Sequence, residues 1–242
     1  MKLTVIYEDD NLIAINKPAN ITVIPDRFNT ELPSVNKLLE KQVGYPVRVV
    51  HRLDRDTTGV LCFAKNEEAH QAVSGLFLNR QVTKLYAGLV HGKVNPSEGR
   101  IENHLTEHPH IKGKMIVAKK GKLSVTDYKV AKQWPLYALL QMQLHTGRTH
   151  QIRVHTQFMG NPIVADVLYG DGKPFFVSTI KKKYALSLKD EEEKPLLSRL
   201  ALHAYSTTLH FPGGKDIKID APMPKDMLAC INQLDKWSKS YL

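Results

Sequence analysis

Residues 51–59 read HRLDRDTTG and lie between two apolar, β-prone runs, 47–50 and 60–64. This arrangement predicts that Asp54 sits on a connection between ordered segments, where a rigid scaffold commonly holds functional residues. Burial raises the pKa of an isolated aspartate, whereas a guanidinium a few ångströms away favours the anion. A carboxylate among arginines therefore suits a nucleophile that is ionised at neutral pH and acts on a polyanion. A plain surface turn is the alternative interpretation.

The composition indicates a globular protein with an anionic partner. The chain has 242 residues, of which 42% are hydrophobic and 24% charged, so it can bury a sizeable core. Lys and Arg number 34 against 24 Asp and Glu, and the net charge of +10 favours a nucleic acid partner. Two cysteines and the lack of a long apolar run predict a cytoplasmic protein without disulfides, thiolate metal sites or membrane spans.

The apolar pattern predicts an α+β protein with a mostly antiparallel sheet. Strands are expected at 3–7 and 12–16 as an N-terminal hairpin, at 85–90, at 123–131 with 136–144, and at 203–211 with 216–219. Helices are expected from an Asn66 cap to Phe77, from a Thr146 cap to Met159, and from Pro224 to Trp237. The charge-rich segments 112–122 and 180–195 are expected to be loops or insertions.

A second cluster, residues 144–155, reads LHTGRTHQIRVH and concentrates two arginines and three histidines. Basic side chains on one short helix make a clamp for phosphate or carboxylate. The histidines at 145, 150 and 155 are five residues apart, so a helix scatters them instead of aligning them as i, i+4 metal ligands. We therefore expect no metal site here.

Together these stretches resemble the RluA-type pseudouridine synthases. The matching segments occur in the family's order over most of the chain: Tyr7–Asp9, Leu12–Pro18, the Asp54 motif, Lys84–Ala87, Thr146–His155 and Arg199–Ala204. The resemblance implies the pseudouridine synthase α+β fold, a bent mixed sheet flanked by helices and loops. It also implies one catalytic domain over residues 1–242, with two lobes that share a sheet and no N-terminal S4-type RNA-binding domain.

By the same resemblance the chain converts a uridine in ribosomal or transfer RNA to pseudouridine. The uracil must leave C1′ through N1, turn over and rejoin through C5, which involves no redox change and requires no cofactor. Asp54 would attack C1′, add to the uracil ring or take a ribose proton, and the residues leave these routes open. Tyr86 matches the family's active-site tyrosine and would stack on uracil or remove the C5 proton; a strand tyrosine half-buried in the core is the alternative.

The resemblance also assigns residues to RNA binding. The target base must leave its stack, at a cost of about a few kcal/mol, and Arg52 matches the arginine that enters the RNA; a surface ion pair is its alternative. Arg153 matches the arginine that pairs with the catalytic aspartate, and Arg148 is the competing choice or else a phosphate contact. Two further residues in or beside the matched stretches are expected to contact substrate: His51 and Leu202.

Two departures from the family stand in the matched regions, Thr58 where serine is commoner and Asn20 where glycine is usual. The lysines of 112–122 are expected either to follow an RNA backbone or to form solvated surface. A catalytically silent RNA-binding protein and a glycoside hydrolase that pairs Asp54 with Asp56 are the rival functions. The crowded arginines and the two-residue spacing disfavour the hydrolase, and we expect a monomer.

Overall fold

The structure is a computed structural model that describes residues 1–25, 31–181, 184–185 and 191–238. The chain divides into two compact units. The first comprises Met1–Tyr86 and His203–Pro222, and the second comprises Ala87–Leu202 and Met223–Leu242. Each unit combines helices with strands that pair mainly in antiparallel fashion, so the predicted α+β class is confirmed. That both units form one catalytic domain with a shared sheet stays a prediction.

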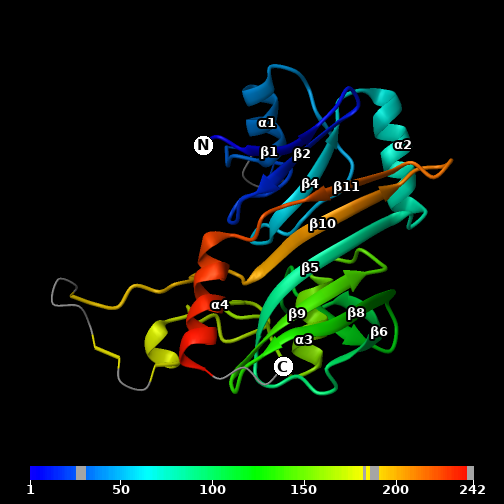
Figure 1. Ribbon diagram of the computed structural model, residues 1–242. Helices are drawn as coiled ribbons and strands as arrows, with labels where there is room; N and C mark the ends of the chain where they lie inside the picture. Colours follow the sequence, from blue (N-terminus) through cyan, green and yellow to red (C-terminus); the bar gives the residue numbers. More distant parts are fainter. Residues whose placement is uncertain (26–30, 182–183, 186–190, 239–242) are drawn as a thin grey trace. The chain divides into compact units, whose positions relative to one another are not determined.

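The first unit contains a sheet in the order β1-β2-β4-β10, with β3 beside β4 and β11 beside β10 (Figure 1). Its strands are β1 (Thr4–Glu8), β2 (Leu12–Lys17), β3 (Arg48–Val49), β4 (Thr58–Ala64), β10 (Leu202–His210) and β11 (Asp216–Asp220). The pair β4–β10 is parallel and the other pairs are antiparallel. Both predicted hairpins, β1–β2 and β10–β11, are confirmed.

Helices α1 (Val35–Val43) and α2 (Glu67–Leu78) belong to the same unit. As predicted, Asn66 caps α2, because its side chain accepts a hydrogen bond from the backbone N–H of Ala69. The apolar face of α2 packs with Leu12 of β2 and Leu209 of β10. Helix α1 was not predicted, although Ser34 precedes it as the N-cap residue and Gly44 ends it in the left-handed region, at φ 82°.

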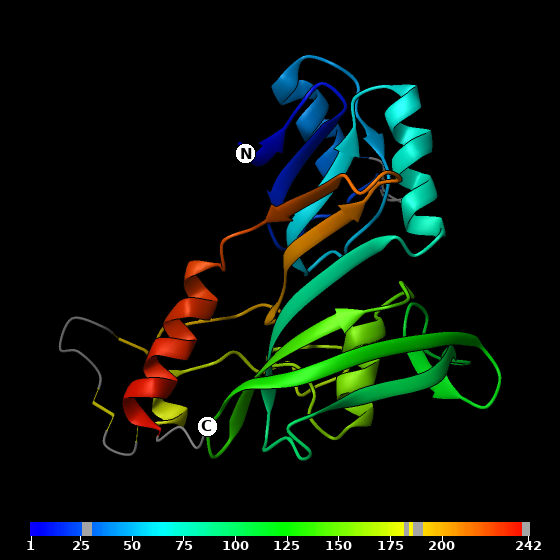
Figure 2. The same ribbon diagram turned by 45° about the vertical axis from the view of Figure 1, so that its right-hand side comes forward.

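Strand β5 (Val82–His91) begins in the first unit and ends in the second. The second unit also contains strands in the order β9-β8-β6-β7, all antiparallel: β6 (Glu98–Glu107), β7 (Met115–Ala118), β8 (Lys122–Gln133) and β9 (Tyr137–Leu144). Figure 2 shows β6, β8 and β9 as long ribbons with α3 (Gln151–Phe158) beside them. Val154 of α3 packs in one core cluster with Leu105 of β6.

The prediction of loops in the charge-rich segments needs correction. Residues 115–118 form β7, although they lie inside segment 112–122. Strand β7 pairs with β6, in which only Ile101 and Leu105 are buried. The sequence of β6 is therefore mostly polar and does not show the alternating pattern that predicts a strand. Segment 180–195 follows a short 3-10 helix, Val177–Thr179, and much of it lies outside the described residues.

The predicted helix 146–159 begins five residues late, at Gln151. Thr146 does not cap it, because its hydroxyl accepts a hydrogen bond from the backbone N–H of Val125 in β8 instead. His150 precedes the helix in the left-handed region, at φ 54°, which breaks any continuous helix through this point. Arg148 therefore lies in a turn before α3 and not on it.

The C-terminal helix α4 spans Lys225–Trp237, close to the prediction. Pro224 is its N-cap residue and not its first helical residue. Of the five residues expected on its apolar face, Met227, Ile231 and Leu234 are buried, whereas Leu228 and Trp237 are exposed. In the described parts of the chain, no helix combines the length and the apolar character that crossing a membrane requires.

Candidate active site

Asp54 lies on the connection between β3 and β4, as the sequence predicts. The connection closes as a turn in which the backbone N–H of Thr57 donates to the carbonyl of Asp54 at 3.2 Å. Leu53 is buried, while Arg52 and Arg55 on either side of Asp54 are exposed. The turn thus anchors one apolar side chain in the core and leaves two guanidinium groups at the surface.

A buried ammonium group, which was not predicted from the sequence, holds this turn. Lys17, at the end of β2, is 0% exposed. Its Nζ donates to the carbonyls of Pro18 at 3.0 Å, Arg55 at 2.8 Å and Thr57 at 3.0 Å. Charge-assisted hydrogen bonds of this kind are about twice as strong as neutral ones. Lys17 therefore fixes the backbone directly after Asp54 and brings a positive charge to the turn.

Tyr86 lies in β5 within the first unit and is buried, at 8% exposure. Burial and, to a smaller extent, the negative charge of Asp54 raise the pKa of Tyr86 above its ordinary value. Asp54 and Tyr86 both belong to the first unit. Because the phenol is neutral at physiological pH, this environment favours stacking and hydrogen bonding by Tyr86 over a free phenolate base.

We predict that Tyr86→Phe lowers the turnover rate by about a hundredfold, the low end for losing a group that takes part in proton transfer. The ring that would stack on uracil remains, so the dissociation constant for RNA is expected to change little. Single-turnover assays and filter binding measure the two effects separately. An unchanged rate would restrict Tyr86 to a packing or stacking role.

The end of the motif is fixed by close packing against β10. The hydroxyl of Thr58 lies 2.9 Å from Nδ1 of the buried His203, and Nε2 of that ring lies 3.2 Å from the carbonyl of Ala221. Thr58 thus keeps the hydroxyl that serine supplies in the family. A Cβ on Gly59 would meet the carbonyl oxygen of Ala204 at 2.1 Å, and its φ is +117°. Only glycine fits this position.

The other departure from the family is Asn20, which stands where glycine is usual. Its φ is 63°, in the left-handed region, where glycine is strain-free and asparagine is one of the few other tolerated residues. Its carbonyl accepts a hydrogen bond from Nε of Arg55 at 3.4 Å. The substitution therefore preserves the loop beside the Asp54 turn.

His51 makes structural contacts in the first unit. Its Nε2 accepts a hydrogen bond from the backbone N–H of Cys62 at 3.0 Å, and its ring stacks on Phe77 at 4.6 Å between centroids. Burial, with a smaller effect of Lys84, lowers the pKa of His51 to about 3. The neutral ring therefore ties the motif to β4 and α2, while its predicted contact with substrate stays a prediction.

In the second unit, Arg153 forms a buried ion pair with Asp166. Its Nε and one terminal nitrogen each donate to a carboxylate oxygen of Asp166 at 2.8 Å, and the side chains are 5% and 0% exposed. The guanidinium also lies 4.9 Å from the ring centroid of Tyr169. Asp166 was not among the predicted partners of Arg153. The predicted pairing of Arg153 with Asp54 joins residues of different units and stays a prediction.

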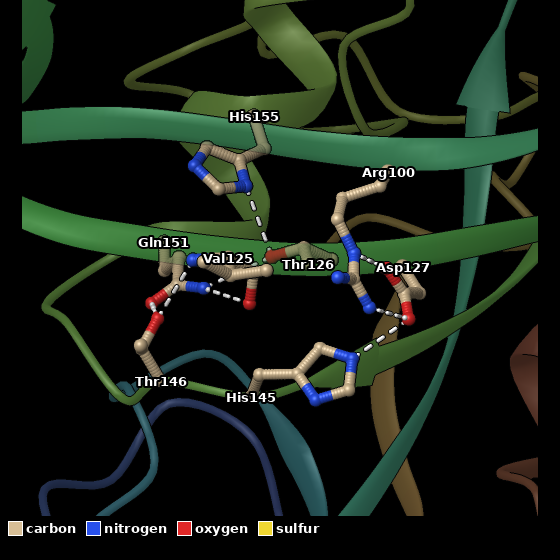
Figure 3. A network of polar contacts seen from close by, with 8 residues as sticks. All are labelled: Arg100, Val125, Thr126, Asp127, His145, Thr146, Gln151 and His155. Carbon is tan, nitrogen blue, oxygen red and sulfur yellow. Dashed lines mark hydrogen bonds and ion pairs between the residues drawn. The ribbon is translucent and has the colours of Figure 1, made fainter.

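The remaining arginine and histidines of the second cluster have separate partners. Arg148 is half-buried, and its Nε donates to the carbonyl of Leu123 at 3.2 Å. His145 Nε2 lies 2.7 Å from Asp127, which also binds Arg100 through two hydrogen bonds (Figure 3). The bonds from Arg100, with help from His145, lower the pKa of Asp127 to about 2.

His150 and His155 point to other partners. Nδ1 of His150 lies 2.9 Å from the hydroxyl of Tyr169, and Nδ1 of His155 lies 2.9 Å from the hydroxyl of Thr126. Among the described residues, no group of three or more His, Cys, Asp and Glu side chains is arranged to hold a metal ion. Leu202, the last predicted substrate contact, is buried at 2% exposure at the start of β10.

We predict an acid-dependent loss of stability from His155. Burial lowers its pKa to about 4, against about 6.5 in an unfolded chain, so between these values the unfolded state binds the extra proton. The contribution of the neutral His155 to the free energy of unfolding is therefore fully present above pH 6.5. It is lost as the pH falls toward 4, and the loss amounts to about 3 kcal/mol in total.

Urea unfolding at a series of pH values tests this prediction. Between pH 4 and 6, His155→Asn should reduce the slope of unfolding free energy against pH by about 1.4 kcal/mol per unit. His110→Asn, at an exposed position between β6 and β7, is the control and should change the slope less than His155→Asn. Equal slopes in wild type and His155→Asn would contradict the prediction.

Comparison with known proteins assigns the class. A sequence profile described as RNA pseudouridylate synthase matches residues 11–158. The chain therefore belongs to the RNA pseudouridylate synthase family, and the predicted resemblance, fold and isomerase class are confirmed.

The similar proteins include bacterial enzymes of this class. Ribosomal large subunit pseudouridine synthase D of Buchnera aphidicola is 36% identical over 97% of this chain and 73% of its own length. The protein of the same name from Neisseria meningitidis serogroup B is 35% identical over 97% of this chain and 62% of its own length. An uncharacterised RNA pseudouridine synthase of Bacillus subtilis, YlyB, is 32% identical over 98% and 74%. The chain thus spans between 62% and 74% of these relatives.

Solved structures share the fold. Human RNA pseudouridylate synthase domain containing 4 matches with a TM-score of 0.72 and 26% identity, over 96% of this chain and 93% of its own. Human RNA pseudouridylate synthase domain containing 1 matches with a TM-score of 0.73 and 24% identity, over 95% and 87%. The second likeness concerns the fold alone.

Proposed function

We propose that this protein converts a uridine of large-subunit ribosomal RNA to pseudouridine, with Asp54 as the group that acts on the glycosyl bond. The observation that carries the proposal is the Asp54 turn itself, which the buried Lys17 fixes by hydrogen bonds to the carbonyls of Arg55 and Thr57. The negative charge of Asp54 also contributes to the raised pKa of Tyr86. The family assignment supports the reaction, and the names of the relatives from Buchnera and Neisseria support the RNA.

The residues of the first unit suit the reaction steps. Asp54 supplies the anion during detachment of uracil, and Lys17 holds the backbone beside it in one conformation, which lowers the cost of reaching the reactive geometry. Tyr86 stacks on the detached base and takes part in proton transfer after C5 has joined the ribose. Arg52, exposed two residues before Asp54, fills the space of the flipped nucleotide.

The second unit contributes cations for the RNA backbone. We assign Arg148 to a phosphate, because its Nε is held by the carbonyl of Leu123 and none of the described hydrogen bonds engages its two terminal nitrogens. Arginine recognises phosphate through such paired N–H groups. We assign Arg153 to orienting Asp54, in addition to its pair with Asp166, because it matches the family's arginine that pairs with the catalytic aspartate.

Residues 108–126 contain five lysines and no acidic residue, and they include β7 with its flanking turns. We assign this basic segment to the RNA backbone. Lys119→Gln with Lys120→Gln should reduce the slope of log affinity against log salt by about 1 to 2, because each lost phosphate contact removes about 0.7 to 0.9. Lys37→Gln, exposed on α1, is the control. An unchanged slope would make the segment solvated surface.

Mapping of pseudouridines in ribosomal and transfer RNA, from cells with and without this protein, tests the proposed function. The expected result is the loss of one or more sites in large-subunit ribosomal RNA, restored by the wild-type chain. Loss confined to transfer RNA would correct the substrate, and an unchanged map would leave a silent RNA-binding protein. We further propose that the protein acts in the cytoplasm as a monomer, without a metal and with both units as one catalytic domain.

A further inference from the structure

Gln151 connects four groups of the second unit through one buried amide. It is the first residue of α3 and is 2% exposed. Its Nε2 donates to the carbonyl of Val125 at 3.0 Å and to the hydroxyl of Thr126 at 2.9 Å. Its Oε1 accepts from the hydroxyl of Thr146 at 2.8 Å and from the backbone N–H of Arg148 at 3.1 Å. Both amide hydrogens and both oxygen lone pairs are therefore used.

The hydrogen bonds fix the direction of the amide. The N–H of Arg148 can only donate, so Oε1 must face the turn, and Nε2 must face the carbonyl of Val125 in β8. Since Nε2 donates to Thr126, the hydroxyl of Thr126 is free to donate onward to Nδ1 of the buried His155. Figure 3 shows this chain, with Gln151 between β8 and the turn that contains Thr146 and with His155 beyond Thr126.

The network thus joins a rigid strand to the turn that carries Arg148. The main chain adds one bond, from the N–H of Gln151 to the carbonyl of Arg148 at 3.1 Å. Arg148 is held at its backbone by Gln151 and at its Nε by Leu123. These two anchors hold the Arg148 backbone and its Nε against the first residues of β8.

We propose that Gln151 is a positioning residue for RNA binding, which acts by holding Arg148 in the orientation that meets a phosphate. The inference rests on the proposed function for the RNA and goes beyond it, because it assigns a specific task to a residue that touches no substrate. When Gln151 is replaced, Arg148 keeps its charged guanidinium but is no longer held in one orientation. Ordering the side chain on binding then costs entropy, which weakens the affinity for RNA.

A double-variant cycle tests the inference, with unmodified large-subunit ribosomal RNA made by transcription as the probe. Gln151→Met keeps the length of the side chain and removes all four hydrogen bonds. It should weaken RNA binding by about tenfold, as Arg148→Ala does, which is the scale of 1.4 kcal/mol. Arg148→Ala should lower the salt slope by about 0.7 to 0.9, as for one lost phosphate contact, whereas Gln151→Met keeps the guanidinium charge and should leave the slope nearly unchanged. The double variant should bind no more weakly than Arg148→Ala alone.

Kinetics and controls separate positioning from general damage. In turnover assays Gln151→Met should raise KM about tenfold and change kcat much less. Gln157→Met, exposed on the same helix, should leave affinity, salt slope and KM unchanged. If Gln151→Met does not fold, Thr146→Ala, which removes one of the four bonds, replaces it in the same cycle with a smaller expected effect.

Two results would overturn the inference. One is full affinity in the Gln151 variant, and the other is a loss that adds to the loss from Arg148→Ala, since an additive loss means that Gln151 does not act through Arg148. Failure of the proposed function has a different signature. In that case the wild-type protein forms no pseudouridine in the probe, while filter binding still reports whether the two residues are coupled.

Discussion

Replacing Asp54 with asparagine is expected to reduce pseudouridine formation by about 10⁴-fold or more, the scale on which an essential nucleophile is lost. Asparagine keeps the shape of the side chain and removes its negative charge, so no anion remains to act on the glycosyl bond. The turn that bears residue 54 is held through backbone carbonyls by Lys17, which the substitution does not change. RNA affinity is therefore expected to stay within about threefold of wild type, less than the tenfold that 1.4 kcal/mol represents.

Asp56→Asn, in the same turn, is the matched control for this prediction. A reaction that depends on Asp54 alone should survive it with little change. If both variants lost all activity and the wild-type enzyme released free uracil, a carboxylate pair of the hydrolase type would replace the proposed mechanism. Full activity in Asp54→Asn would remove Asp54 from the chemistry.

The second large effect is on stability. Asp166→Asn is expected to lower the free energy of unfolding by about 3–5 kcal/mol, because it leaves the buried Arg153 guanidinium without its Asp166 counter-charge. The carboxylate also accepts hydrogen bonds from the backbone N–H groups of Leu168 and Tyr169 at 2.9 and 3.0 Å. In a protein of this size the melting temperature should fall by roughly 10 °C.

Thermal and urea unfolding measure this effect, with Glu98→Gln as control. Glu98 pairs with Lys129 at 3.7 Å, and both side chains are 69% exposed, so solvent screens the pair and little stability depends on it. If the Asp166→Asn variant were as stable as the wild type, the ion pair between Asp166 and Arg153 would not stabilise the second unit.

The elements that were predicted correctly have local signatures. Strands β2 and β4 are apolar runs bounded by turn residues. Helix α2 was predicted from its N-cap residue, Asn66, and from apolar residues that recur at helical spacing. The position of Asp54 between β3 and β4 follows from the same runs. These features depend on residues close together in the sequence, so a single sequence reveals them.

The missed features depend on partners that are distant in the sequence. Thr146 has the residue type of a helix cap, but its hydroxyl accepts a hydrogen bond from the backbone N–H of Val125 on β8. Helix α3 begins later, at Gln151. Lys17 ends an apolar run, and its sequence context does not distinguish it from a surface lysine. Its partners, the carbonyls of Arg55 and Thr57, are distant in the sequence. The pairing of Arg153 with Asp166 likewise follows from the tertiary fold, which composition and spacing do not contain.

The reaction itself offers the most direct test, since joining C5 of uracil to the ribose must release the hydrogen of that carbon. RNA transcribed with uridine tritiated at C5 should release tritium to water in the presence of the wild-type protein, with no free uracil. The same RNA should release none with Asp54→Asn. Tritium release by the Asp54 variant at the wild-type rate, or free uracil formed by the wild-type protein, would contradict an isomerisation that depends on Asp54.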